Sequence, residues 1–384
     1  MSRTVAVVTG TRAEYGLLRG TMERIETRDD LELAVVVTGM HLSPRHGRTV
    51  TEIAADGFDI DRRVEMQLAG DSGRSMAKSL GVGLSGMADA LGDLDPDVVL
   101  VLGDRDEALA GGVAAAHMNV PVAHVHGGDA MDGAIIDDSI RHALTKFAHL
   151  HFPVSAKSAQ RIEKLGEEPW RITTVGAPGL DEIRDAAVTS ADELAERYGI
   201  DTDAPLVVVV QHPVTTQPER AGEQMRATLE AVTATGAQTV VVYPNSDAGG
   251  DRAIAAIEAY ESTDQLTAFE SLPRADYLGL VASASALVGN SSSGIIEAPS
   301  LDVPVVDVGP RQAGRERAEN TVSVPHEREA IERAVDRCLT DGSVQRQARE
   351  CENPYDYGGA ADRIVERLAT VELTDELLRK RLTY

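Results

Sequence analysis

Short runs of apolar residues recur along the whole chain, and each run ends in a polar turn. Several runs are uninterrupted, as in VVLVL at residues 98–102 and LVVVV at 206–210. A continuous apolar run is typical of a strand that is covered on both faces of a parallel sheet. The runs predict strands at residues 5–8, 33–37, 97–102, 120–125 and 150–154 in the first half, and at 206–210, 239–242, 267–269, 286–288 and 303–308 in the second.

Stretches with helical periodicity lie between these runs, and residues 57–60 lead toward one further strand. Strands that alternate with helices form parallel sheets with helices on both faces. The pattern therefore predicts an α/β protein. Helices are expected at residues 76–91, 108–117 and 138–148, and again at 220–233, 252–260, 275–283 and near 327–339.

The alternation is interrupted once, at residues 175–179 (VGAPG), where glycine and proline cluster. A chain of 384 residues suits two domains better than one core. We expect two Rossmann-like doubly wound domains facing a cleft, residues 1–177 and 178–360, with a hinge at 176–179 that closes the cleft. The tail has a helical period over 361–381, so we expect residues 361–384 to form a helix that crosses back to the first domain.

One stretch of the second domain, residues 286–297, joins an apolar strand to a small polar turn and a helix start. Gly289 and Asn290 permit a tight turn, and three serines follow where the first N–H groups of the helix are free. Such a helix start suits an anion, here a diphosphate bound without metal. Glu297, one to two turns later, is placed to accept hydrogen bonds from a ribose diol. An ordinary strand–turn–helix with serine caps remains an equally open interpretation of this stretch.

Charged and imidazole side chains follow the predicted strand ends. In the first domain they include Arg12, Asp104 and His126, and in the second His212 follows the strand at 206–210. The carboxyl ends of parallel strands meet at one edge of a sheet, where ligands bind. Several acids and imidazoles at one edge are what general acid/base catalysis needs. For Asp138 a simple helix-capping role remains open.

The charge of the chain is lopsided, with 62 acidic and 37 basic residues and a net charge of −25. Such a surface repels phosphates and excludes nucleic acid and membrane surfaces as partners. The acidic, lysine-poor composition is typical of a halophilic protein from a high-salt cytoplasm. Cys338 and Cys351 have neither metal-ligand nor disulfide-framework spacing, and no apolar run approaches the ~18 residues of a membrane span. We expect a cytoplasmic enzyme without metal.

Eight longer motifs occur in order between about residues 5 and 320, and together they resemble the hydrolysing UDP-N-acetylglucosamine 2-epimerases. The resemblance implies a GT-B fold, no cofactor, a UDP-sugar substrate and a dimer or tetramer. It also implies a reaction in which UDP is eliminated to a glycal, which is then hydrated with inversion at C2 to N-acetylmannosamine, a sialic acid precursor. The motifs are TGTRAEYG at 9–16, GDR at 103–105, HVHGGD at 124–129, IDDSIRHALTK at 136–146, QHPVTT at 211–216, YPNSDAG at 243–249, GNSSSGIIE at 289–297 and GPRQAGR at 309–315.

The resemblance also implies roles for individual residues, with the sugar on the first domain and UDP on the second. The implied catalytic residues are Asp104, Arg105, His126, Asp137 and His212. The implied UDP-sugar contacts are Arg12, His41, His212, Asn245, Leu272, Ser291, Ser292, Glu297 and Arg311.

Two departures from the family pattern concern the sugar. Some relatives carry glutamate at the position of His126, and the loop before Asp137 is two residues longer than in some relatives. Alternative functions are therefore hydrolysis and epimerisation of UDP-2,4-diacetamido-2,4,6-trideoxyglucose, non-hydrolysing epimerisation of UDP-N-acetylglucosamine, and nucleotide-sugar binding without turnover. A retaining glycosyltransferase fits less well, because the chain carries proton-transfer groups and no evident acceptor-binding region.

Overall fold

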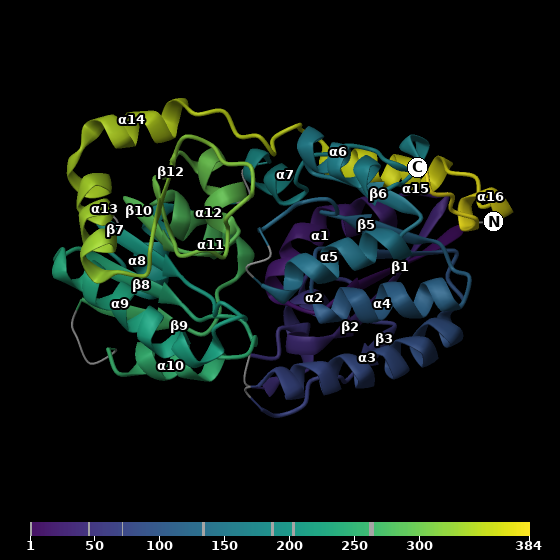
Figure 1. The fold of residues 1–384 in the computed structure, drawn as a ribbon, viewed down its shortest axis with the longest axis horizontal. Coiled ribbons are helices and arrows are strands. Elements are labelled where there is room, and N and C mark those ends of the chain that lie inside the picture. Colours follow the sequence, from purple (N-terminus) through teal and green to yellow (C-terminus); the bar gives the residue numbers. More distant parts are fainter. Residues whose placement is uncertain are drawn as a thin grey trace. The chain divides into compact units, whose positions relative to one another are not determined.

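The computed structural model describes residues 2–44, 47–70, 72–132, 135–185, 188–201, 204–260 and 265–384. Its elements group into two compact units (Figure 1). The two long segments of unit 1 and unit 2 meet after Asp181 and after Asp356. The sequence analysis expected these boundaries after residues 177 and 360. Unit 1 comprises Met1–Ala130, Ile136–Asp181 and Tyr357–Tyr384, and unit 2 comprises Met131–Ile135 and Glu182–Asp356.

Unit 1 is built on a six-stranded sheet in which every pairing is parallel. The strand order is β3-β2-β1-β4-β5-β6, so the order reverses between β1 and β4. The apolar runs of the sequence thus form the strands of a doubly wound sheet, as predicted. The strands are β1 (Arg3–Thr9), β2 (Leu31–Thr38), β3 (Arg62–Val64), β4 (Val98–Leu102), β5 (Val122–Val125) and β6 (Leu150–Phe152).

Helices cover both faces of this sheet. On one face, Leu18 and Met22 of α1 pack with Ile364 and Leu368 of α15 over the strands. On the other face, α3, α4 and α5 bury apolar residues against the sheet. The helices of unit 1 are α1 (Arg12–Glu26), α2 (Val50–Ala55), α3 (Gly73–Leu94), α4 (Asp106–His117), α5 (Ile136–Phe147), α6 (Ala156–Lys164), α15 (Ala360–Thr370) and α16 (Asp375–Leu378), with short 3-10 turns η1 (Gly39–Leu42) and η3 (Pro169–Arg171).

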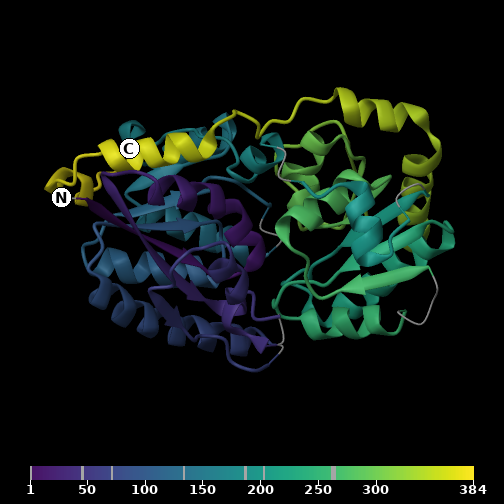
Figure 2. The same ribbon diagram turned by 180° about the vertical axis from the view of Figure 1, so that it is seen from behind.

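The last helical segment of the chain belongs to unit 1. α15 lies beside α1 in both views (Figures 1 and 2). The expected continuous helix over 361–381 is wrong, because α15 ends at Thr370 and α16 starts only at Asp375. The break has a local cause. Val371 takes an extended backbone conformation, which suits a β-branched residue, and its side chain is buried in the core of unit 1.

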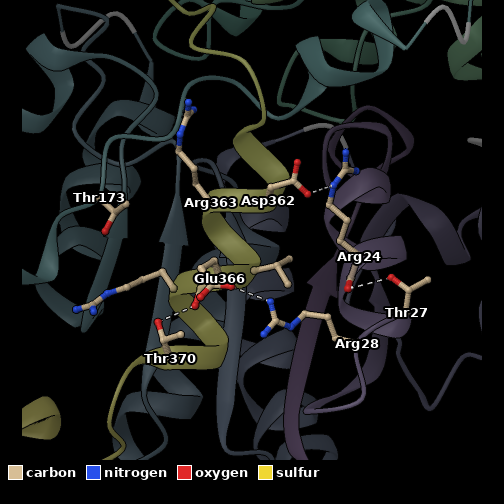
Figure 3. Close-up of a pocket in the computed structure, with 10 residues that line it drawn as sticks. Arg24, Thr27, Arg28, Thr173, Asp362, Arg363, Glu366 and Thr370 are labelled. Atoms are coloured by element: carbon tan, nitrogen blue, oxygen red, sulfur yellow. Dashed lines mark hydrogen bonds and ion pairs between the residues drawn. The ribbon is translucent and has the colours of Figure 1, made fainter.

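A groove between α1 and α15 is lined by charged side chains (Figure 3). Arg24 Nε lies 2.5 Å from Asp362 Oδ1, and Arg28 Nη1 lies 2.9 Å from Glu366 Oε2. Both arginines are near the C-terminal end of α1, which runs back toward the amino ends of the strands. The groove therefore joins two helices at the sheet edge opposite to the one where ligands bind.

Unit 2 repeats the architecture of unit 1. Its six strands are all parallel in the order β12-β11-β10-β7-β8-β9, which reverses between β7 and β10. The edge strand β12 was not predicted, because its four residues are largely exposed and form no apolar run. The strands are β7 (Leu206–Val210), β8 (Gln238–Val242), β9 (Leu266–Phe269), β10 (Ala286–Gly289), β11 (Val305–Val308) and β12 (Thr321–Val324).

The sheet of unit 2 is also covered on both faces. α9, α10, α13 and α14 bury apolar residues on one face, and α8, α11 and the 3-10 turn η5 bury them on the other. The short α7 (Gly179–Arg184) contains the point where the chain passes from unit 1 into unit 2. The other helical elements are α8 (Ala191–Tyr198), η4 (Pro218–Arg220), α9 (Ala221–Ala234), α10 (Gly250–Glu258), α11 (Arg274–Ala282), α12 (Ser293–Ile296), η5 (Ala298–Leu301), α13 (Arg328–Thr340) and α14 (Gly342–Glu350).

The predicted fold class is confirmed: each unit is a Rossmann-like doubly wound domain, as in GT-B proteins. Among the described residues, no helix combines the length and apolar character needed to cross a membrane.

Candidate active-site residues in the two units

In each unit some of the predicted site residues lie where the strand order reverses. In unit 1 the loops after β1 and β4 carry Arg12, Asp104 and Arg105, and in unit 2 the loops after β7 and β10 carry His212 and the serines. Helices leave opposite faces of a sheet at such a point, which opens a crevice for a ligand. The topology therefore places these residues at the kind of crevice where doubly wound sheets bind ligands.

An ion-pair cluster centred on Arg141 lies at the edge of unit 1. Arg141, on α5, is fully buried and pairs with Asp104 after β4 and, at 3.3 Å, with Asp138 in its own helix. Asp138 Oδ1 also lies 3.7 Å from His142 Nε2. A buried guanidinium between two carboxyl groups fixes the orientation of both. Asp104 is thus held in place by a residue that the sequence analysis did not single out.

His126 and Asp137 flank this cluster. His126 follows β5, is 6% exposed, and has a left-handed backbone with φ of 64°. Non-glycine residues in that conformation carry local strain and concentrate at functional sites. Asp137 lies in the first turn of α5 and is 4% exposed. Residues 133 and 134 of the longer loop before Asp137 lie outside the described residues.

Two further carboxyl groups lie beneath the loops of unit 1. Glu14, in the first turn of α1, accepts a hydrogen bond from Gly10 N at 2.7 Å. Burial raises its pKa to about 8, and neighbouring Glu107 adds to the shift. Glu107 packs so closely on the loops after β1 and β2 that a Cβ at Gly10 would lie 2.4 Å from its Cγ. Its Oε2 is 3.4 Å from Arg105 Nε. The pair therefore supports Arg105, with Glu14 neutral near pH 7.

The two remaining predicted contacts of unit 1 have different surroundings. Arg12, the first residue of α1, pairs with Glu52 of α2 at 2.5 Å. His41 is fully buried, and its ring nitrogens lie 3.1 Å from Thr9 Oγ1 and 2.7 Å from Thr49 Oγ1. Burial lowers the pKa of His41 to about 4, so its imidazole is neutral at pH 7. It can donate or accept a hydrogen bond but carries no charge for a phosphate.

The serine turn of unit 2 differs in part from the prediction. Gly289 has φ of 132°, and a Cβ there would lie 2.2 Å from Val210 O, so glycine is required. The predicted helix is a single turn, α12, followed by η5, because Pro299 interrupts the hydrogen-bonding pattern. Ser292 therefore caps no long helix and makes no side-chain cap bond. Ser291 Oγ does accept from Ser293 N, at 3.3 Å. The turn offers hydroxyls and N–H groups rather than the dipole of a long helix.

Asn290 links several predicted residues of unit 2. Its side chain accepts from His212 N at 2.7 Å and donates to His212 O at 2.9 Å. Its own carbonyl accepts from Arg311 Nη1 at 3.2 Å. Asn245 N in turn donates to His212 Nδ1 at 3.1 Å, which leaves Nε2 as the protonated nitrogen when the ring is neutral. The structure therefore brings His212, Asn245 and Arg311 together around one buried amide.

Glu297 and Leu272 complete the predicted set of unit 2. Glu297 caps the C-terminal end of α12, one turn after the serines, and its Oε1 lies 2.9 Å from Arg274 Nη2. Leu272 is 5% exposed and packs in the apolar core beside β7 and β10. Leu272 is thus a core residue of unit 2, and Glu297 offers the turn a carboxylate.

Sequence reasoning missed four residues that hold the predicted ones in place: Arg141, Glu107, Asn290 and Arg274. Two of them, Arg141 and Asn290, stood inside quoted motifs, so their positions were visible while their partners were not. No group of three or more potential metal ligands occurs among the described residues. The donor set of carboxylates, imidazoles, guanidinium groups and hydroxyls is suited to proton transfer in unit 1 and anion binding in unit 2.

Comparisons with known proteins match nearly the whole chain. Residues 23–369 match the family described as UDP-N-acetylglucosamine 2-epimerase. The UDP-N,N′-diacetylbacillosamine 2-epimerase (hydrolyzing) of Legionella pneumophila is 38% identical over 380 residues, which cover 99% of each chain. The UDP-N-acetylglucosamine 2-epimerase of Neisseria meningitidis is 31% identical over 379 residues, 99% of this chain and 98% of that one.

A solved structure shows the same fold. The UDP-GlcNAc 2-epimerase of Methanocaldococcus jannaschii, in complex with UDP-GlcNAc and UDP, matches with a TM-score of 0.77 and 18% identity. The match covers 95% of this chain and 99% of that one.

Proposed function

The chain belongs to the UDP-N-acetylglucosamine 2-epimerase family, and from that premise we propose that it is a hydrolysing 2-epimerase of a UDP-linked 2-acetamido sugar. One observation carries the proposal. In each sheet, predicted residues follow the strands where the order reverses: Asp104, a candidate proton-transfer group, in unit 1, and His212 with the serine turn, suited to an anion, in unit 2. The relatives described as hydrolysing support the hydrolytic outcome.

The proposed reaction has two stages. A base removes the proton at C2 while the C1–O bond breaks, and UDP leaves with the bonding electrons to give a glycal. Water then adds its hydroxyl group to C1, and a proton returns to C2 on the opposite face. The sum is UDP-sugar plus water giving UDP plus the free sugar inverted at C2. The chemistry needs a base, an acid and positive charge on the departing diphosphate.

Unit 1 supplies the proton-transfer groups in this proposal. Asp104, oriented by its pairing with Arg141, is the candidate base. Asp137 and His126 are the candidate partners for the return of the proton, because both are almost completely buried at the same sheet edge. Arg105, next to Asp104 and supported by Glu107, carries positive charge that stabilises the developing anion.

Unit 2 supplies the UDP contacts. Arg311 and the turn of Ser291 and Ser292 are suited to the diphosphate, and Glu297 to the ribose. His212 is held by Asn290 and Asn245 and can donate from its ring to a phosphate oxygen. Arg12 of unit 1 brings a second guanidinium group for the leaving UDP.

The sugar carried by UDP is the finer part of the proposal. The sequence motifs favoured UDP-N-acetylglucosamine, with N-acetylmannosamine as product. The Legionella relative, at 38% identity, is named for UDP-N,N′-diacetylbacillosamine, the 2,4-diacetamido-2,4,6-trideoxy sugar. The Neisseria relative, at 31%, is named for UDP-N-acetylglucosamine. Identity therefore favours the diacetamido substrate first and UDP-N-acetylglucosamine second.

An NMR time course in heavy water tests the proposal. The protein is incubated with each UDP-sugar separately, and the anomeric signals and deuterium at C2 are followed. We expect free C2-inverted sugar carrying deuterium, with release of UDP, from at least one of the two. An intact epimerised nucleotide sugar would instead indicate a non-hydrolysing epimerase. Binding of UDP without turnover of either sugar would indicate a nucleotide-sugar-binding protein.

A further inference from the structure

Arg274, which the proposed function does not use, lies between two carboxylates from different elements of unit 2. It is the first residue of α11, and its Nη2 lies 2.9 Å from Glu297 Oε1. Its Nε lies 3.1 Å from Glu182 Oε2, on α7. The three side chains are 14%, 6% and 13% exposed, respectively. They form a largely buried chain of alternating charge that ends at the predicted ribose ligand.

The guanidinium group of Arg274 keeps its charge in this setting. Burial opposes the charged guanidinium group, but Glu297 and Glu182 outweigh it and raise the pKa of Arg274. Tyr277 lies one turn further along α11, and burial, with Glu297 nearby, raises the pKa of its hydroxyl. The phenol is therefore neutral and adds no second negative charge beside Glu297. Arg274 is thus the fixed cation that faces Glu297.

A guanidinium group orients a carboxylate as well as neutralising it. Its planar array of N–H donors fixes the direction from which the carboxylate oxygen is approached. An ionised carboxylate held on one side in this way can accept two hydrogen bonds from a vicinal diol on another. A lysine in the same place would keep the charge but not the planar array of donors.

Resting on the proposed function, in which unit 2 binds UDP, we propose that Arg274 is a positioning residue that orients Glu297 toward both hydroxyls of the ribose. It thereby makes unit 2 selective for ribonucleotides over 2′-deoxyribonucleotides. Glu182 holds Arg274 from the other side, through Nε of the guanidinium group.

Calorimetric titration of the full chain with UDP and with 2′-deoxy-UDP tests the proposal. The variants are Arg274→Gln, Arg274→Lys and Glu297→Gln. We expect the wild type to prefer UDP by roughly tenfold to a hundredfold, the usual effect of a hydrogen bond to a charged group. Arg274→Gln should remove most of that preference, because it lowers the affinity for UDP while the affinity for 2′-deoxy-UDP changes less than about threefold. Arg274→Lys, which keeps the charge, should retain part of the preference for UDP that Arg274→Gln loses.

Two further variants guard against a merely structural effect. Arg197→Gln removes another arginine that is paired with α11, through Asp276 at 2.5 Å, and should leave the preference unchanged. Arg274→Gln alone leaves two buried carboxylates without the cation between them, so that variant can fail to fold. The double variant Arg274→Gln with Glu182→Gln removes one of these carboxylates, and its preference for UDP over 2′-deoxy-UDP then tests the positioning role.

The remaining outcomes separate this inference from the proposed function. Equal loss of affinity for both nucleotides in Arg274→Gln would overturn the positioning role and make Arg274 a support for the turn as a whole. A wild type that binds UDP and 2′-deoxy-UDP equally would overturn the inference while leaving UDP binding intact. A wild type that binds neither would overturn the proposed function itself.

Discussion

The two sheet edges have the same topology but opposite chemistry. At the reversal point of unit 1, buried ionisable groups crowd together, with Arg141 between two carboxylates and Glu14 beside Glu107. At the reversal point of unit 2, Asn290 instead organises backbone groups, an imidazole and the guanidinium of Arg311, and the one carboxylate of the predicted set, Glu297, is paired with Arg274. The fold sets where a ligand can bind, and the side chains decide whether a proton moves or an anion is held.

The largest expected effect separates catalysis from binding at the edge of unit 1. Asp104→Asn removes the carboxylate paired with Arg141, and we expect kcat to fall about a thousandfold, within the range of general acid/base contributions. The affinity for UDP should change less than about threefold, because Asp104 is not among the proposed UDP contacts. Steady-state kinetics and calorimetry measure the two. Asp93→Asn, an exposed carboxylate on α3, is the control. Equal losses of kcat and of UDP affinity would show that Asp104 serves binding as much as catalysis, and would contradict the contrast between the two units.

The next effect tests the unusual protonation of unit 1. Burial raises the pKa of Glu14 from 4.5 to about 8, so between those values the native state keeps a proton that the unfolded chain releases. The contribution of this bound proton to the free energy of unfolding is fully present below pH 4.5 and is lost as the pH rises to about 8. Glu14→Gln does not titrate. Its free energy of unfolding relative to wild type should therefore rise by on the order of 3 kcal/mol between pH 5 and pH 8.

Urea denaturation at a series of pH values measures this difference. Glu23→Gln, on the same helix with its side chain about half exposed, is the matched control and should show no such trend. A Glu14→Gln variant whose relative stability is independent of pH would show that Glu14 is ionised in the native state.

The smallest effect concerns the edge of unit 2. Arg311→Gln removes a guanidinium group held by the Asn290 carbonyl, and we expect the Kd for UDP to rise roughly tenfold. The kcat at saturating substrate should fall less than the affinity. Arg328→Gln, an exposed arginine on α13, is the control. Loss of kcat with unchanged UDP affinity would place Arg311 among the catalytic groups and weaken the contrast between the units.

Much of the fold was predictable because parallel strands that are buried on both faces consist of uninterrupted runs of apolar residues. The run at 206–210 became β7 without a change of bounds. The edge strand β12 was missed because partly exposed residues need no such run. The spacing of apolar residues also did not predict how short the helix at Ser293 is, because that spacing continues past Pro299, where the helix is interrupted.

The candidate site was predictable in its positions but not in its partners. Motifs that follow strand ends indicated Asp104 and His212, since the chain itself fixes where those loops emerge. They did not indicate that Arg141 pairs with Asp104, or that Arg274 joins Glu297 to Glu182. Those contacts bring together residues from separate elements, and their spacing along the chain carries no signal of it.

The return of α15 to unit 1 has a consequence for synthesis on the ribosome. One face of the unit 1 sheet is covered by Ile364, Val365 and Leu368, and burying such a side chain stabilises a core by about 1.5–3 kcal/mol. A nascent chain that has reached residue 356 already holds every helix of unit 2 but still lacks the helix that completes unit 1. The domain encoded first is therefore the last that can finish folding.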